Sequence, residues 1–141
     1  MAFRGDFQPT ERAYVHPLQV LPSDIDELGH ANNVVWLRWV NEAALAHSES
    51  LGYGPAGLVA LSVLWIVRRH DIEYLLPAFV DDQLEAVTWA HSLSGASSVR
   101  HTLIKREGRV AARAETTWVT IDAKTHKPIR VPKPLLTAYG F

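Results

Sequence analysis

A long helical pattern from Val34 to Leu51 constrains the fold of this chain more than any other feature. Apolar residues, with one histidine among them, recur at spacings of three and four, and the pattern stops before Gly52. Two asparagines precede the pattern, and asparagine is a common cap at the start of a helix. Glycine is common just after the end of a helix, so the sequence marks both ends. The segment is apolar around most of its circumference, and such a helix is usually buried on more than one side. The rest of the chain must therefore cover it.

The segments around this helix read as strands joined by short turns. The expected strands cover residues 12–21, 59–74, 82–93, 98–106 and 109–122. Pro17 in the first of them is typical of an edge strand, Glu107-Gly108 is a hairpin signal, and residues 133–138 can form a single helical turn. Consecutive strands with tight turns indicate an antiparallel sheet. One apolar helix against such a sheet makes an α+β domain, with the sheet curled over the helix.

Composition narrows the class of protein. The chain has 141 residues, a formal net charge of −1 and no cysteine. This length is typical of one domain, here residues 1–141. The charge argues against nucleic-acid binding, and the absence of cysteine excludes disulfides, thiolate nucleophiles and zinc–sulfur sites. Because no apolar run resembles a signal-peptide core or a membrane span, we expect a cytoplasmic protein with no nucleic-acid or membrane partner.

The loop before the helix carries the densest set of catalytically usable groups in the chain. Residues 22–36 contain two aspartates, a histidine, two asparagines and a glycine. Motifs for serine nucleophiles, phosphate-binding loops and zinc hydrolases are absent from the sequence, and its seven histidines show no metal-ligand spacing. We therefore place the chemistry in this loop and expect no metal.

The same loop carries a family resemblance. Its pattern D-x-D-x-x-G-H-x-N-N-x-x-W, residues 24–36, resembles the signature of the hotdog-fold thioesterases. It is most similar to the branch of bacterial long-chain acyl-CoA and plant acyl-ACP thioesterases, and the sister 4-hydroxybenzoyl-CoA branch shares the aspartate and the glycine. Residues 68–77 and 116–122 resemble the second and last strands of the family. The resemblance implies a curled sheet around the central helix and dimers with the active site at their interface.

The resemblance also implies roles within the loop. Asp26 matches the family's loop carboxylate and would act as general base or nucleophile, with a turn or cap aspartate as the structural alternative. His30 would orient the thioester carbonyl or the water. Asn33 would bind the carbonyl or cap the helix, Asn32 favours the cap, and Gly29 lets the backbone approach the ligand closely or makes a turn. Unpaired N–H groups and the dipole at the helix start would polarise the carbonyl.

Four positions qualify the comparison. Trp36 fills the space where the family usually has tyrosine. It is a candidate for substrate binding, but it has no hydroxyl. Leu28 replaces an asparagine of the plant enzymes, so the role of that amide does not carry over. Asp24 is expected to be structural, because turn-stabilising aspartates are common. Glu42 is expected to be a solvated or salt-bridged helix residue rather than a second catalytic carboxylate.

The phosphates of CoA need donors, which we expect at the surface near the turn at residues 94–97. Ser97, Ser98 and Arg100 are suitable donors there. The alternatives are other basic residues of the predicted sheet, namely Arg68, Arg69, Lys105 and Arg106. A basic residue on an antiparallel sheet can also simply face water.

The sequence thus predicts a hydrolase, namely a cytoplasmic acyl-CoA thioesterase that needs no cofactor, because CoA is part of the substrate. It would act as a homodimer or as a homotetramer built from two dimers. An acyl-ACP thioesterase and a non-catalytic acyl-CoA binding protein on the same fold are the alternatives, and a hotdog-fold dehydratase is a third. Release of free thiol from an acyl-CoA separates hydrolysis from the other activities.

Overall fold

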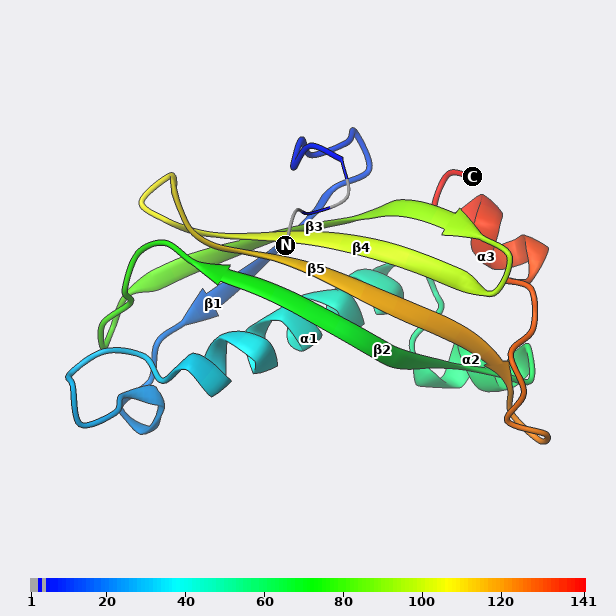
Figure 1. Ribbon diagram of the computed structural model, residues 1–141, viewed down its shortest axis with the longest axis horizontal. Helices are drawn as coiled ribbons and strands as arrows, with labels where there is room; N and C mark the ends of the chain where they lie inside the picture. Colours follow the sequence, from blue (N-terminus) through cyan, green and yellow to red (C-terminus); the bar gives the residue numbers. More distant parts are fainter. Residues whose placement is uncertain (1–2, 4) are drawn as a thin grey trace.

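The computed structural model describes residue 3 and residues 5–141, and shows a curled sheet lying along one side of a long helix (Figure 1). The strands are β1 (Tyr14–Gln19), β2 (Val63–Tyr74), β3 (Gln83–Ser94), β4 (Ser97–Arg106) and β5 (Arg109–Asp122). Their order is β1-β3-β4-β5-β2, and neighbouring strands are antiparallel. The predicted α+β architecture is confirmed, and β1, which contains Pro17, lies at an edge as expected.

The central helix α1 spans Asn33–Ser50 and begins and ends where the sequence predicts. Gly52, with a φ of 86°, turns the chain away after the last helical turn. One stripe of α1 is buried against the sheet, comprising Trp36, Trp39, Val40, Ala43, Ala44, His47 and Ser48. Val34 and Leu45 remain 72% and 47% exposed. A single chain therefore covers α1 on one side, not on several sides as its composition suggests.

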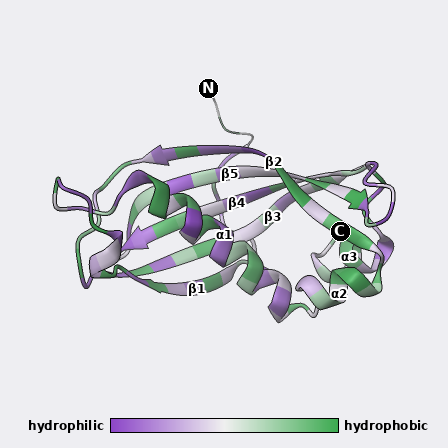
Figure 2. Ribbon diagram, turned by 90° about the horizontal axis from the view of Figure 1, so that it is seen from below, coloured by the Kyte–Doolittle hydropathy of each residue, from purple (hydrophilic) through white to green (hydrophobic). Residues whose placement is uncertain are grey.

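The strand expected over residues 59–74 is wrong at its start. Residues Pro55–Ala60 form a short helix, α2, and β2 begins only at Val63. Pro55 lies in the first turn of α2, where a helix tolerates the missing N–H, and Ser62, with a φ of 57°, turns the chain into β2. Figure 2 shows α2 beside the C-terminal helix α3 (Lys133–Ala138), beyond one end of α1. None of the helices in the described part of the chain has the length and hydropathy needed to span a bilayer.

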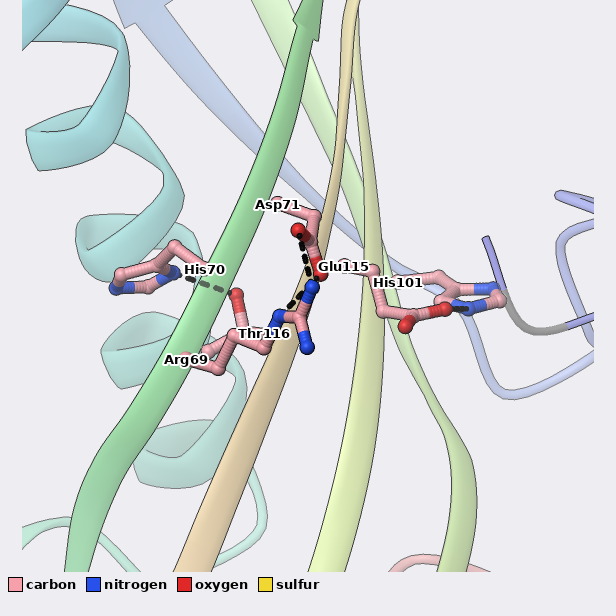
Figure 3. A network of polar contacts seen from close by, with 6 residues as sticks. All are labelled: Arg69, His70, Asp71, His101, Glu115 and Thr116. Atoms are coloured by element: carbon pink, nitrogen blue, oxygen red, sulfur yellow. Dashed lines mark hydrogen bonds and ion pairs between the residues drawn. The ribbon is translucent and has the colours of Figure 1, made fainter. Parts of the chain in front are cut away.

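The N-terminal segment lies over the outer face of the sheet, opposite α1 (Figure 1). The ring of Phe7 stacks on His101, with ring centroids 4.0 Å apart, and His101 is fully buried. His101 Nε2 lies 3.0 Å from Glu115 Oε2. In Figure 3 these two side chains point away from α1, whereas His70 points towards it. The described part of this segment is therefore packed against the sheet.

Packing of α1 on the sheet depends on small residues in the buried stripe. Ala43 is fully buried, and a larger side chain there must push the helix from the sheet. We expect Ala43→Leu to lower the free energy of unfolding by about 1–3 kcal/mol, measured by urea denaturation. Ala46→Leu, on a half-buried part of the same helix, is the matched control and should change stability by less than about 0.5 kcal/mol. Equal losses in both variants would contradict this packing.

Candidate active site

The loop between β1 and α1 is a small hairpin held by its own backbone. Ile25 and Ala31 pair as an antiparallel bridge. The Asp26 N–H donates to the His30 carbonyl at 3.0 Å, and the Gly29 N–H donates to the Asp26 carbonyl at 3.1 Å. Gly29 has a φ of 86°, a conformation that favours glycine. Gly29 therefore makes the turn that holds Asp26 and His30 on adjacent arms of the loop.

Asp24 fastens this loop to the helix. Its side chain is almost fully buried, with Oδ1 2.8 Å from Arg38 Nη2 and Oδ2 accepting the Leu21 N–H at 2.9 Å. Arg38 also pairs with Glu42, whose Oε1 lies 3.4 Å from Arg38 Nε. The structural role predicted for Asp24 and the salt-bridged state predicted for Glu42 are both confirmed. Both oxygens of Asp24 are therefore occupied, whereas Glu42 is an exposed carboxylate paired with Arg38 through one oxygen.

Asp26 differs from Asp24 in having an available oxygen. Its side chain is half-buried, and Oδ1 accepts the Leu28 N–H at 2.9 Å, which stabilises the turn. Oδ2 has no partner among the described residues. The half-buried ring of His30 contacts Phe79 edge to face, with ring centroids 6.3 Å apart. Asp26 therefore has a structural role through one oxygen and keeps the other for chemistry.

The start of α1 leaves one backbone donor open. Asn32 is the cap, since its Oδ1 accepts the Val34 N–H at 3.0 Å and its carbonyl accepts the Val35 N–H at 2.9 Å. The predicted cap is thereby confirmed, and it occupies two of the N–H groups expected to be free. The Asn33 N–H and its exposed side-chain amide have no partner among the described residues. The carbonyl of Asn33 accepts the Tyr74 hydroxyl at 3.1 Å, which ties the end of β2 to the helix start.

Trp36 lies in the core beneath this loop. It is 2% exposed, and its ring centroid lies 5.1 Å from that of Trp39 and 6.1 Å from that of Tyr74. The structure thus places Trp36 under the loop, where it supports Tyr74 beside the helix start. A direct contact with substrate stays a prediction.

The donors expected for CoA phosphates do not gather at the surface. Ser97 is half-buried, whereas Ser98 and Arg100 are only 8% and 6% exposed, so the surface position predicted for Arg100 is wrong. The reason is that elements distant in sequence cover both faces of β4. Ser98 and Arg100 line a cavity of about 190 Å³ beside the C-terminal half of α1. A helix of 18 residues is roughly 27 Å long, so this cavity and the Asp26 loop lie near opposite ends of α1.

The alternative basic residues are largely engaged with carboxylates. Arg69 Nε lies 3.0 Å from Asp71 Oδ2, on the outer face of β2 (Figure 3). Arg106 Nε lies 3.0 Å from Asp82 Oδ2. Within the residues that the structure describes, no group of three or more histidine or carboxylate side chains converges to hold a metal ion.

Arg100 belongs to a buried polar cluster that the sequence did not indicate. Its Nη1 donates to His47 Nδ1 at 2.9 Å and to Thr88 Oγ1 at 3.0 Å, and its Nη2 lies 3.5 Å from the Tyr139 hydroxyl. Burial, and then the nearby charge of Arg100, lower the pKa of His47 to about 4. His47 is therefore neutral near pH 7 and can accept the hydrogen bond. The sequence offered one signal for this cluster, namely a histidine among the apolar residues of the helix. A polar side chain buried there requires a hydrogen-bond partner.

Comparison with known proteins agrees with this geometry. The model of the thioesterase-like superfamily matches residues 20–139. The acyl-CoA thioester hydrolase YbgC of Escherichia coli O6:H1 is 29% identical over 127 residues, which is 87% of this chain and 92% of YbgC. The long-chain acyl-CoA thioesterase FadM of Escherichia coli K12 is 31% identical over 110 residues, which is 74% of this chain and 80% of FadM.

Solved structures show the same fold. The 1,4-dihydroxy-2-naphthoyl-CoA thioesterase Slr0204 from Synechocystis has a TM-score of 0.82 at 21% identity, covering 90% of this chain and 95% of Slr0204. The DHNA-CoA thioesterase of Staphylococcus aureus has a TM-score of 0.78 at 22% identity, covering 91% and 83%. Fold and loop thus define a hotdog-fold enzyme of the thioester hydrolase class. More particularly, the chain belongs to the thioesterase-like superfamily.

The lowered pKa of His47 makes stability depend on pH. The unfolded chain, with an ordinary histidine pKa of 6.5, binds more protons than the folded chain between pH 6.5 and about 4. Stability therefore falls as the pH drops through this window, by about 2 kcal/mol between pH 7 and pH 5 for this histidine. His47→Asn keeps an acceptor near Nδ1 but does not titrate. Between pH 7 and pH 5 its free energy of unfolding, measured by urea denaturation, should therefore fall by about 2 kcal/mol less than that of the wild type.

Two other histidines contribute to the same pH dependence. Burial also lowers the pKa of His70 and of His101. Both remain in His47→Asn, so the difference between the two proteins isolates His47. Parallel stability curves for wild type and His47→Asn would contradict the buried, neutral state of this side chain.

Proposed function

We propose that the protein hydrolyses the thioester bond of an acyl-CoA, giving a free carboxylic acid and CoA. The observation that carries this proposal is that the loop leading into α1 leaves Asp26 Oδ2 unpaired among the described residues, while the N–H at the start of α1 is also open. The names of the relatives YbgC and FadM, both acyl-CoA thioester hydrolases, favour CoA over acyl carrier protein as the carrier. A cytoplasmic location stays a prediction from the sequence.

The proposed chemistry begins with the carbonyl oxygen at the helix start. There the Asn33 N–H and the positive end of the helix dipole stabilise the oxyanion that forms. Asp26 Oδ2 accepts a proton from water as the water oxygen bonds to the carbonyl carbon. The oxyanion then collapses, the carbon–sulfur bond breaks, and the CoA thiolate takes up the proton. In the nucleophilic variant, Oδ2 itself bonds to the carbonyl carbon, and the carbon–sulfur bond breaks to release the CoA thiolate. Water then cleaves the acyl-aspartyl anhydride, which gives the free acid, restores the Asp26 carboxylate and supplies the proton that the thiolate takes up.

Neighbouring side chains support this step. The exposed Asn33 amide, which lacks a partner among the described residues, can donate to the carbonyl, and His30 can orient the attacking water. Arg68 is exposed on β2 and forms no ion pair within the described chain. It is the basic residue that best fits the CoA phosphates, because Arg100 is buried and Arg69 and Arg106 are paired.

Asp26→Asn tests the chemistry directly. The asparagine Oδ1 can still accept the Leu28 N–H, so the turn and the stability should be preserved. Loss of the carboxylate should lower kcat by about 100-fold or more, measured as free thiol released from a panel of acyl-CoAs. Glu27→Gln, which changes the exposed neighbouring carboxylate, should keep wild-type activity. Absence of hydrolysis with every acyl-CoA, or full activity in Asp26→Asn, would overturn the proposal.

We propose further that two chains pair through β2. β2 is an edge strand of twelve residues, and Leu64 and Ile66 on it are 37% and 48% exposed. An edge of this length and hydrophobicity pairs readily with another strand. The opposite edge, β1, has only six residues and contains Pro17, which weakens it as a pairing edge. Two-fold pairing at β2 is antiparallel, so the start of one β2 lies beside the end of its partner.

Introducing a charged residue on each edge strand in turn tests which edge forms the interface between two chains. Ile66→Lys places an ammonium group on the proposed interface and should convert the dimer to monomers in sedimentation equilibrium, with loss of thioesterase activity. Val15→Lys makes the same change on β1, at a residue that is 51% exposed, and should leave both properties unchanged. A wild-type protein that is monomeric and active would overturn the pairing but not the proposed reaction.

A further inference from the structure

The cavity at the far end of α1 combines an apolar wall with a buried cation. Its apolar lining includes one residue from each of five elements, namely Leu45 of α1, Leu58 of α2, Trp65 of β2, Leu93 of β3 and Val99 of β4. Arg100 lies on the same wall and is 6% exposed. An apolar site with one buried charge is suited to a ligand that is mostly apolar and carries a single opposite charge.

Arg100 has no carboxylate partner in the described chain. Its polar neighbours are the neutral His47, the Thr88 hydroxyl and the Tyr139 hydroxyl. The buried contact between His101 and Glu115, by contrast, includes a carboxylate. A buried guanidinium with only neutral partners lacks the compensation that such a charge needs. The missing group is therefore an anion.

Trp118, which lines the same cavity, carries a second donor without an acceptor. Its buried Nε1 has no hydrogen-bond partner among the described residues. Trp65, which also lines the cavity, donates its Nε1 to Thr120 Oγ1 at 2.7 Å. Because buried donors are normally satisfied, the open N–H of Trp118 indicates, independently of Arg100, that an acceptor is absent.

We propose that this cavity binds a carboxylate carried on an apolar body, with Arg100 as its ion-pair partner and Trp118 Nε1 as a further donor. An arginine fork fits a carboxylate, whereas the single cation and apolar wall suit a more highly charged phosphate poorly. An apolar cavity of about 150 Å³ accepts benzene, so one of about 190 Å³ takes a ring or a short alkyl chain.

Two sources can supply this carboxylate. One is the far end of the acyl group of a substrate whose carbonyl lies at the loop of the partner chain, which would make the enzyme selective for ω-carboxyacyl thioesters and which rests on the proposed function and pairing. The other is a free carboxylic acid, including the product of hydrolysis. Both place the same group against Arg100, and the experiment distinguishes them.

Direct binding tests the site without any reaction. Octanoate and octan-1-ol fill similar volumes and differ in charge, and calorimetric titration gives the affinity of each. Wild type should bind octanoate at least about tenfold more tightly than octanol, the margin of a charge-assisted pair. Arg100→Met should abolish that preference while octanol still binds. A general folding defect would weaken both ligands together.

Further variants keep the test decisive if Arg100→Met does not fold. Trp118→Phe removes the N–H together with part of the indole ring, and should weaken octanoate severalfold more than octanol. Arg109→Met removes an exposed cation at the β4–β5 turn, and its octanoate affinity should equal that of wild type. Equal affinity of wild type for octanoate and octanol, or an unchanged ratio in Arg100→Met or in Trp118→Phe, would overturn the proposal.

Hydrolysis identifies the source of the carboxylate. If the acyl end is bound, wild type should hydrolyse 7-carboxyheptanoyl-CoA with a higher kcat/KM than octanoyl-CoA, and Arg100→Met should reverse that order. If a free acid is bound, octanoate should bind and the two substrates should be hydrolysed alike. If neither thioester is hydrolysed, the proposed function fails for these substrates, and the binding titration still decides whether the cavity takes a carboxylate.

Discussion

Burial of α1 against the concave face of the sheet is the interaction on which the rest of this structure depends. Trp36 and Trp39 lie in edge-to-face contact at the centre of that interface, 2% and 1% exposed. An indole buries about 150–250 Å², which corresponds to roughly 4–6 kcal/mol of transfer free energy before conformational entropy is counted. The same packing holds the helix lengthwise along the sheet. It therefore determines where both helix ends lie, and with them the loop of Asp26 and the cavity.

The two ends of α1 carry opposite partial charges, and the structure places suitable groups at each. The N-terminal end faces the loop of Asp26 and offers an open N–H to a developing oxyanion. The C-terminal end lies near His47, to which the buried Arg100 donates. The negative end of the dipole favours a cation there, which helps to explain why this chain tolerates a buried guanidinium. A helix end carries only about half an elementary charge. It therefore compensates only part of the charge of the Arg100 guanidinium, and a carboxylate can compensate the rest.

The parts of the fold that could be predicted from sequence are those with local signals. Asn32 and Gly52 mark the ends of α1 within a residue. The family resemblance ranked Asp26 above Asp24, and the structure shows that both oxygens of Asp24 are engaged while Asp26 keeps one open among the described residues. The burial of Arg100 had no local signal, because β4 is buried on both faces by segments distant in the chain. In α2, the β-branched Val59 suggested a strand although Pro55 favoured a helix start. Contacts between distant segments therefore bury Arg100, whereas a local signal, Pro55 in the first turn, accounts for α2.

In the dimer proposed above, the position of β2 would bring the loop of one chain near the cavity of the other. The last residue of β2, Tyr74, contacts the helix start through the Asn33 carbonyl, and Trp65 near its first residue lines the cavity. Within one chain, these points are separated by most of α1. When two β2 strands pair antiparallel, the beginning of one lies beside the end of the other. A short acyl group with its carbonyl at Asn33 then lies nearer the cavity of the partner chain than its own, so each active site would require both chains.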